Sequence, residues 1–255
     1  DTVRLAEAAG FFILPVSRTS FDHGGTRCRG VGQTTAEIIV FMTQDAVMAG
    51  PRALQELLRC FDEPLVGAAF GRQLPRPDAG PMEAHARLFN YPAKNRTVSW
   101  ADAPRLGLKA AFLSDSFAAY RREALAAVGG FPTRIILGED MVVGAKLLLA
   151  GWKIAYSADA TVYHSHSYGM MQEFRRYFDT GVMHAEEKAL LGHFGAATGE
   201  GRRFVVAEQR YLWHAGFYGE AMTAILRNAA KLLGYHCGRS HQWLPCRLKR
   251  CCSMN

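Results

Sequence analysis

Three separate segments of the 255-residue chain carry side chains that could bind a divalent cation and move a proton. Asp45 ends the apolar run IIVFMTQD, the acid pair Glu139 and Asp140 opens a helical pattern, and His164 and His166 follow a short apolar run. A carboxylate and imidazoles can hold a divalent cation on phosphate oxygens, with water completing its coordination. A further carboxylate beside it can act as a general base. Together the segments predict metal-assisted chemistry on a phosphate-bearing substrate.

Each segment alone also has an ordinary structural explanation. Asp45 could cap the next element or form a turn. Two acids in the first turn of a helix complement its dipole, and two nearby histidines can belong to a polar surface. These alternatives stay open for each segment taken singly. Convergence of all three favours a functional site, because open α/β sheets bind ligands at the carboxyl ends of their strands.

The sequence pattern around these side chains predicts an α/β domain. Residues 37–42 and 65–70 are nearly continuous apolar runs, which are typical of strands in a sheet covered on both faces. Residues 51–61 lie between them and form a helical pattern with proline in its first turn. Strand and helix alternate, so we expect a Rossmann-like three-layer domain with a mostly parallel sheet.

The other segments extend this arrangement. We expect further strands over residues 11–16, 110–120, 153–156 and 161–163. We expect further helices over residues 2–10, 82–89, 121–128, 139–150, 170–191 and 203–233. The helices of the C-terminal third are predicted to lie against the α/β core.

The composition is that of a globular protein. Hydrophobic residues make up 49% of the chain and charged residues 21%, which suits one large domain or two small ones. No apolar run approaches the roughly 18 residues needed to span a bilayer. The six cysteines show no spacing typical of a zinc site, so we expect free thiols in a reducing cytoplasm.

The formal charge of +7 is concentrated at the C-terminal end. Residues 202–255 contain nine basic and two acidic residues, so this segment carries the whole excess. Such a segment suits an anionic membrane surface or a phosphate-bearing partner, and a solvated basic helix is the alternative. We expect no nucleic acid as a partner, because the segment has no recognisable nucleic-acid reading module. A peripheral position on the inner face of the plasma membrane follows as an expectation.

The order of short motifs resembles glycosyltransferase family 2, and within it the bacterial rhamnosyltransferases. The similarity covers essentially the whole chain, and it rests on the succession FDHGGTR, VFMTQDA, GRQLP, YRREALAAVGGFP, GEDM, HSH and QEFRRYFD. The resemblance implies a GT-A fold that binds a nucleotide-diphosphosugar and an enzyme that inverts the anomeric carbon. It implies a donor such as dTDP-rhamnose and a polysaccharide or lipid-linked saccharide as the acceptor.

The resemblance also assigns roles to single residues. Asp45 matches the last acid of the D-x-D metal motif, whereas Thr43 stands where the family has the first acid. His164 matches a further ligand of Mg²⁺ or Mn²⁺, with His166 as a second candidate, and Asp140 matches the catalytic base. Donor contacts are implied for Gly25, Arg27, Thr43, Gln44 and Arg175. Contacts on the acceptor side are expected for Arg72, Gln73, Ser114, Asp115, Glu139 and Tyr168.

Compared with the family pattern, the chain looks like a fragment without the opening strands that hold the nucleotide base. We therefore expect an N-terminally incomplete catalytic domain over residues 1–200 and a basic helical extension over residues 201–255. Two other functions remain open. One is a nucleotidyltransferase acting on sugar phosphates, and the other is a nucleotide-sugar-binding module without turnover, which Thr43 in place of an acid favours.

Overall fold

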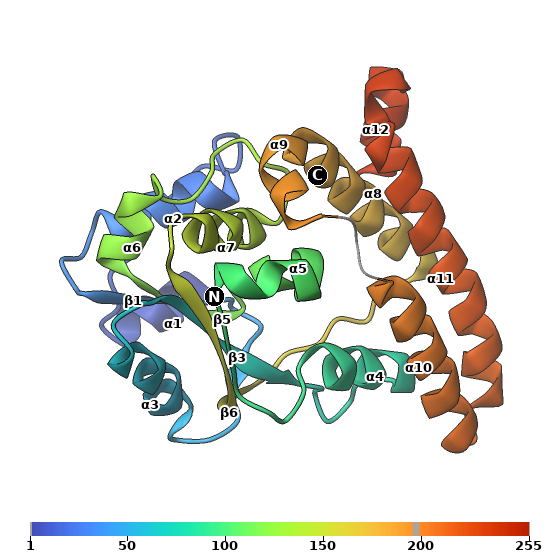
Figure 1. The fold of residues 1–255 in the computed structure, drawn as a ribbon, viewed down its shortest axis with the longest axis horizontal. Coiled ribbons are helices and arrows are strands. Elements are labelled where there is room, and N and C mark those ends of the chain that lie inside the picture. Colours follow the sequence, from blue (N-terminus) through green and yellow to red (C-terminus); the bar gives the residue numbers. More distant parts are fainter. Residues whose placement is uncertain (1, 196–198, 255) are drawn as a thin grey trace.

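The computed structural model describes residues 2–195 and 199–254, and its centre is a six-stranded sheet (Figure 1). The strands follow the order β1-β5-β3-β6-β2, and β4 pairs with β6 beside this path. Their bounds are β1 Ile38–Met42, β2 Val47–Met48, β3 Val66–Leu74, β4 Arg96–Val98, β5 Phe117–Arg121 and β6 Lys153–Tyr163.

The sheet is mixed, which confirms the α/β class and changes the expected pairing. β1, β3 and β6 run in one direction, and β3 and β6 form a parallel pair. β5 lies between β1 and β3 and runs against both, while β2 and β4 run against β6. β1, β3 and β6 therefore point the same way, as predicted. Most neighbouring pairs, however, are antiparallel. A continuous apolar run indicates that a strand is buried, but it does not indicate which strand lies beside it.

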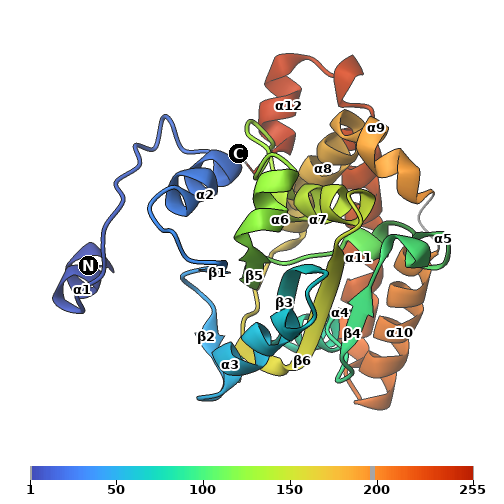
Figure 2. The same cartoon turned by 60° about the vertical axis from the view of Figure 1, so that its left-hand side comes forward.

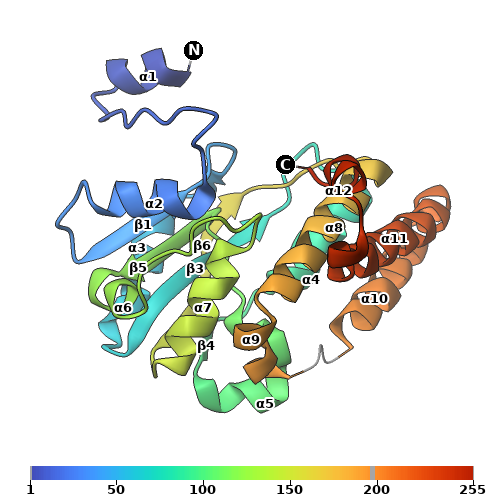
Figure 3. The same ribbon diagram turned by 90° about the horizontal axis from the view of Figure 1, so that it is seen from above.

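Helices cover both faces of the sheet (Figure 3). The α-helices are α1 Thr2–Ala8, α2 His23–Val31, α3 Ala53–Leu58, α4 Pro81–Asn90, α5 Ala103–Leu106, α6 Arg122–Ala127, α7 Glu139–Leu149, α8 Met170–Glu186, α9 Lys188–Leu191, α10 Glu200–His214, α11 Tyr218–Arg239 and α12 Cys246–Cys252. Leu125 of α6 and Val142 of α7 pack in one cluster with Phe70. Leu57 of α3 packs in the other with Ala69. Because neighbouring strand residues point to opposite faces, the two clusters lie on opposite sides of the sheet.

Several predicted elements differ in the structure. Residues 153–156 and 161–163 belong to the single strand β6, and residues 11–16 form no strand. The strand expected over residues 110–120 begins only at Phe117, since residues 107–111 form a 3₁₀ turn. The helix expected over residues 203–233 is interrupted at Gly216, whose positive φ of 79° ends α10 and lets the chain turn into α11.

The outer helices lie on the side of the molecule away from β1 (Figures 1 and 3). There α11 packs closely on α8, because glycines remove the side chains between the two helices. A Cβ atom on Gly234 would lie 2.3 Å from the carbonyl oxygen of Phe174, and one on Gly238 would lie 2.0 Å from that of Phe178. At the opposite end of the molecule, α1 projects from the body and has no buried residue (Figure 2).

None of the helices in the described part of the chain is long and apolar enough to cross a membrane. All six cysteines are free thiols, as predicted from their spacing.

Candidate active site

Asp45, His164 and His166 form one cluster, as the sequence pattern predicts. The Nε2 atoms of His164 and His166 lie 3.3 Å and 3.6 Å from Oδ2 of Asp45. The potential ligand atoms of all three residues lie within 4.8 Å of one another. The register of the sheet explains this proximity, because Val47 of β2 pairs with Tyr163 of β6. The loop before β2 and the loop after β6 are therefore brought to the same place.

The imidazole of His164 is fixed by the buried side chain of Gln73. The amide nitrogen of Gln73 donates to Ser114 Oγ at 2.8 Å, which identifies its other end as the acceptor. This Oε1 atom accepts from Arg87 Nη1 at 2.6 Å and lies 2.8 Å from His164 Nδ1. His164 Nδ1 therefore carries the proton and donates it to Gln73. The Nε2 atom is left with a free lone pair beside Asp45, which is the orientation that a metal ligand requires.

The ionisation of the cluster suits metal binding. Burial, reinforced by the charge of Arg87, lowers the pKa of His164 to about 4. The pKa of His166 is also lowered, chiefly by burial. For Asp45, burial acts to raise the pKa, but Thr43 and the two imidazoles outweigh it and the pKa is lowered. Near neutral pH the cluster thus presents one carboxylate and two neutral imidazoles, the forms that bind cations. This donor set fits a divalent metal.

A second cluster places three carboxylates around one guanidinium. Arg27 Nε lies 2.9 Å from Asp115 Oδ2, and Arg27 Nη1 donates to Glu139. The other oxygen of Asp115 accepts from the buried hydroxyl of Tyr120 at 2.5 Å. Asp115 and Glu139 are only 3% and 6% exposed, so their charges are held by Arg27 rather than by water.

Asp140 is the carboxylate of this cluster that forms no ion pair with the residues described in the structure. Its oxygens accept from the backbone N–H of Met141 at 2.8 Å and of Asp115 at 3.3 Å, and the residue is half-buried. Gly138 makes this placement possible, since its left-handed φ of 80° turns the chain directly into α7. Burial and the neighbouring charge of Glu139 raise the pKa of Asp140, and burial with Asp140 raises that of Asp115. A partly buried carboxylate with a raised pKa can accept a proton from a substrate hydroxyl.

One loop connects the two clusters. Ser114 accepts from Gln73, which holds His164, and the next residue, Asp115, donates its N–H to Asp140. A continuous set of contacts therefore links Asp45 and His164 to Asp140.

Several residues with an expected ligand contact are instead engaged within the protein. Gln73, Asp115 and Glu139 were expected to contact the acceptor, but they are buried and hydrogen-bonded to other side chains. Arg72 donates to the carbonyl of Tyr91 at 3.1 Å, on the opposite face of β3 from Gln73.

The expected donor contacts divide in the same way. Gly25 donates to Asp22 at 2.9 Å and so belongs to the N-cap of α2, while Arg27 points to the carboxylates. Thr43 and Gln44 lie in the loop that carries Asp45, where Gln44 is exposed. Ser114, which was expected on the acceptor side, lies between the two clusters and accepts from Gln73.

Arg175 faces away from the metal ligands, and Arg176 faces toward them. The charge of Arg175 acts on the Cys252 thiol of α12. The guanidinium of Arg176 lies 5.7 Å from the ring centre of Tyr168, which stacks on His166 at 5.1 Å. Successive residues of a helix point about 100° apart, so only one of two adjacent arginines can face the cluster. Tyr168 thus forms a wall of the metal cluster.

The sequence pattern did not identify three residues that support these clusters. Arg87 holds Gln73, Tyr120 holds Asp115, and Arg227 of α11 donates to the carbonyl of Tyr168 at 2.6 Å. Each is distant in sequence from its partner or lies inside an ordinary strand or helix pattern, so no local signal marks it.

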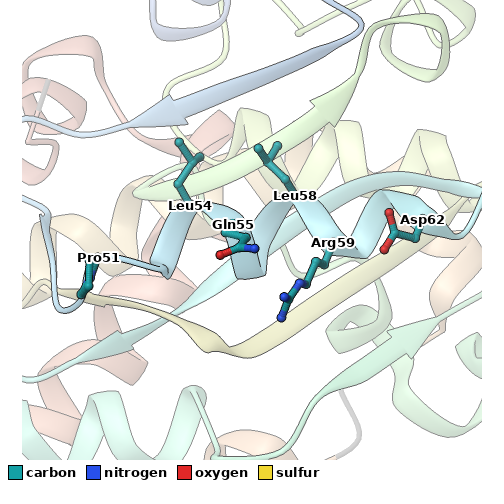
Figure 4. Close-up of a pocket in the computed structure, with 6 residues that line it drawn as sticks. All are labelled: Pro51, Leu54, Gln55, Leu58, Arg59 and Asp62. Carbon is teal, nitrogen blue, oxygen red and sulfur yellow. The ribbon is translucent and has the colours of Figure 1, made fainter.

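A shallow pocket of about 480 Å³ lies along α3 and shares no residue with either cluster (Figure 4). Its lining residues are Pro51, Leu54, Gln55, Leu58, Arg59 and Asp62. The lining combines three apolar residues with Gln55, Arg59 and Asp62, and it contains none of the residues of the two clusters.

An α/β fold that combines a possible divalent-cation site with a nearby carboxylate suits an enzyme acting on a phosphate-bearing substrate. Residues 15–206 match the model described as glycosyltransferase like family 2. The chain therefore belongs to this glycosyltransferase family, as its motif order predicted.

Two curated relatives are similar over nearly the whole chain. The chain is 46% identical over 248 residues to the O-antigen chain rhamnosyltransferase RfbN of Salmonella typhimurium. The matched region covers 96% of this chain and 78% of that protein. The chain is 45% identical over 247 residues to the O-antigen chain rhamnosyltransferase WbaN of Salmonella anatum, with the same shares covered.

Among solved structures, the fold is similar to that of the mannosyltransferase PcManGT from Pyrobaculum calidifontis, determined in complex with GDP-Man and Mn²⁺. The TM-score is 0.62 at 17% identity, and the match covers 94% of this chain and 74% of that one. At this identity the likeness concerns the fold, and it confirms the GT-A architecture.

Proposed function

We propose that the protein transfers rhamnose from dTDP-rhamnose to a hydroxyl group of a growing polysaccharide on a lipid carrier, with inversion at the anomeric carbon. The names of the two Salmonella relatives support the sugar and the type of polysaccharide. The observation that carries the proposal is the contact path from the Asp45–His164 pair through Gln73 and Ser114 to Asp140. It joins a cation site for a diphosphate to a carboxylate suited to deprotonate an acceptor.

In this mechanism Asp140 takes the proton of the acceptor hydroxyl as the oxygen attacks C1 of the sugar. The bond between C1 and the diphosphate oxygen breaks with its electron pair, and dTDP leaves. Glu139 is bound to Arg27, which supports Asp140 rather than Glu139 as the base. Arg176, next to Tyr168 and His166, is suited to offset charge on the departing diphosphate.

Asp45, His164 and His166 would hold the divalent cation, which supplies positive charge beside the diphosphate when bound. We favour Mn²⁺ over Mg²⁺, because two of the three ligands are imidazoles and Mg²⁺ prefers oxygen ligands. Gln73 fixes the tautomer of His164 and so prepares the site for the ion.

We also propose that residues 1–200 form the catalytic domain and residues 201–255 a helical extension that supports it. Arg227 of the extension contacts the loop after β6 directly. We further propose a cytoplasmic enzyme that is peripheral on the inner face of the plasma membrane, where a lipid-linked acceptor would be reached.

Incubation of the protein with dTDP-rhamnose, Mn²⁺ and saccharide acceptors tests the proposal. We expect release of dTDP that depends on both acceptor and metal. Matched incubations with dTDP-glucose and GDP-mannose measure the donor preference. Formation of dTTP from dTDP-rhamnose and pyrophosphate would instead identify a nucleotidyltransferase. Tight donor binding without dTDP release on any acceptor would identify a binding module, which is the function favoured by Thr43 in place of an acid.

A further inference from the structure

The outer face of α11 is an exposed apolar strip. Its six large side chains stand out from the protein, and the most exposed of them, Met222, is 62% accessible. They are Tyr218, Met222, Ile225, Leu226, Leu232 and Leu233. Their spacing places them on one side of the helix, and the buried residues Ala221, Ala224, Gly234 and Gly238 lie on the other side. The strip runs along most of the 22-residue helix, which is about 33 Å long.

Exposed basic and aromatic side chains are carried by α10, by the end of α11 and by the segment that follows α11. Exposed arginines come from α10, from the end of α11 and from α12, and they are Arg202, Arg203, Arg210, Arg239, Arg247 and Arg250. Trp243, between α11 and α12, is 89% exposed. Arg203 pairs with Glu200 of α10, whereas Glu208, the other acidic residue of α10, is buried. An apolar strip with a basic rim therefore covers the outer side of the molecule.

We propose that this surface, the α11 strip with its basic rim, docks on an anionic lipid bilayer. A helix with one apolar face, flanked by arginine and tryptophan, is the kind that lies in the plane of a membrane interface. The basic rim is complementary to anionic headgroups. A second copy of the chain is a poorer partner, because a two-fold contact through this face would bring one set of arginines close to another.

The docking face is also linked to the candidate active site. On the inner side of α11, Arg227 donates to the Tyr168 carbonyl and pairs with Glu173, while Tyr168 stacks on His166. Docking would thus fix how the active site is oriented toward the bilayer. Only the purpose of docking, which is access to a lipid-linked acceptor, rests on the proposed function.

Sedimentation with vesicles of phosphatidylcholine, with or without phosphatidylglycerol, tests this surface. We expect the protein to bind the anionic vesicles and to be released by high salt. The double variant L226Q/L233Q should bind at least roughly tenfold more weakly, because it lacks two exposed leucines that docking would bury in the bilayer. The double variant R247Q/R250Q should bind anionic vesicles about tenfold more weakly.

Two matched variants control for composition and charge. L65Q/L149Q removes two exposed leucines elsewhere, and R59Q/R105Q removes two exposed arginines outside the surface. Both should bind vesicles as the wild type does. Equal binding by all variants, or no binding by the wild type, would overturn the proposal. So would a wild-type dimer in sedimentation velocity that L226Q/L233Q converts to a monomer, since a second copy would then cover the strip.

Sugar transfer to a water-soluble acceptor separates this proposal from the proposed function. All four variants should retain wild-type transfer, because none changes either cluster. If no transfer occurs while vesicle binding follows the expected order, the proposed function fails and the docking surface stands.

Discussion

Gln73 holds the imidazole of His164 with its Nε2 atom directed at Asp45. The 2.8 Å contact to His164 Nδ1 is possible because Arg87 and Ser114 orient the Gln73 amide from both ends. Gln73 comes from β3 and His164 from the end of β6, which are parallel neighbours. The parallel pair β3 and β6 therefore determines the geometry of the candidate metal ligand His164.

Replacing Gln73 should weaken metal binding more than it weakens the fold. We expect Gln73→Leu to reduce Mn²⁺ affinity about 10- to 100-fold, because the tautomer of His164 is no longer fixed. Isothermal titration with Mn²⁺ measures this change. Gln55→Leu, on the exposed side of α3, is the matched control and should bind Mn²⁺ normally. Unchanged affinity in the Gln73 variant would contradict the orienting role.

Asp140→Asn should remove transfer while donor binding remains. A general base contributes about a hundredfold to ten-thousandfold to a rate, so we expect a loss of kcat in this range. Rapid-quench measurement of dTDP release gives kcat, and titration gives donor affinity. The exposed carboxylate of Asp78 provides the control variant Asp78→Asn. Turnover by Asp140→Asn at the wild-type rate would rule out the assignment.

On acidification, the activity should be lost at a higher pH than it would be if the base were an aspartate with an ordinary pKa. The base acts only when ionised, and burial and Glu139 raise the pKa of Asp140, so activity is lost as the pH falls through this raised value. The charge of Arg27 lowers the pKa of both Asp115 and Asp140. In Arg27→Gln the acidic limb of the pH–kcat profile should therefore move to higher pH.

Arg27→Lys retains the charge and serves as the comparison. Its acidic limb should lie closer to that of the wild type than the limb of Arg27→Gln does. A limb that stays in place in both variants would show that Arg27 does not control the ionisation of Asp140. Arg27 also packs against the core, since its guanidinium lies 5.7 Å from the ring centre of Phe131. Circular dichroism therefore checks that both variants keep the fold.

Arg176 should matter for the donor and Arg175 should not. We expect Arg176→Gln to raise the KM for dTDP-rhamnose several-fold, since a charge beside His166 and Tyr168 is lost. Arg175→Gln removes the adjacent charge, which faces α12, and should leave KM nearly unchanged. Steady-state kinetics at saturating acceptor compare the two variants. The reverse order would restore the role that the family motif implies for Arg175.

The glycine contacts between α8 and α11 should tolerate no side chain. Gly238→Ala should lower the free energy of unfolding by about 1–3 kcal/mol, because its Cβ would lie 2.0 Å from the Phe178 carbonyl oxygen. Gly219→Ala, also on α11, meets no atom within 4 Å and should change the stability by less than about 0.5 kcal/mol. Urea unfolding measures both values. Equal stability of the two variants would mean that the helices can move apart freely.

The amino-acid sequence determined the family, the α/β class and the three chemically active segments. Motifs such as VFMTQDA and GEDM are short and local, and members of the family carry them in the same order along the chain. They can therefore be recognised without the structure. Asp45 and His164 are far apart in sequence, but each follows an expected strand. Their proximity at the edge of the sheet could therefore be predicted. The acid pair at the start of a helical pattern likewise predicted Asp140 as a candidate base.

Only the tertiary structure decided which polar residues serve the ligands and which serve the protein. Gln73 and Asp115 looked like contacts for an acceptor, but the sheet buries them and turns them toward His164 and Tyr120. Strand polarity, the direction of Arg176 and the placement of Arg27 depend on which elements lie side by side. The sequence lists each residue's chemistry, whereas the partner of a buried polar group is chosen by packing between distant segments.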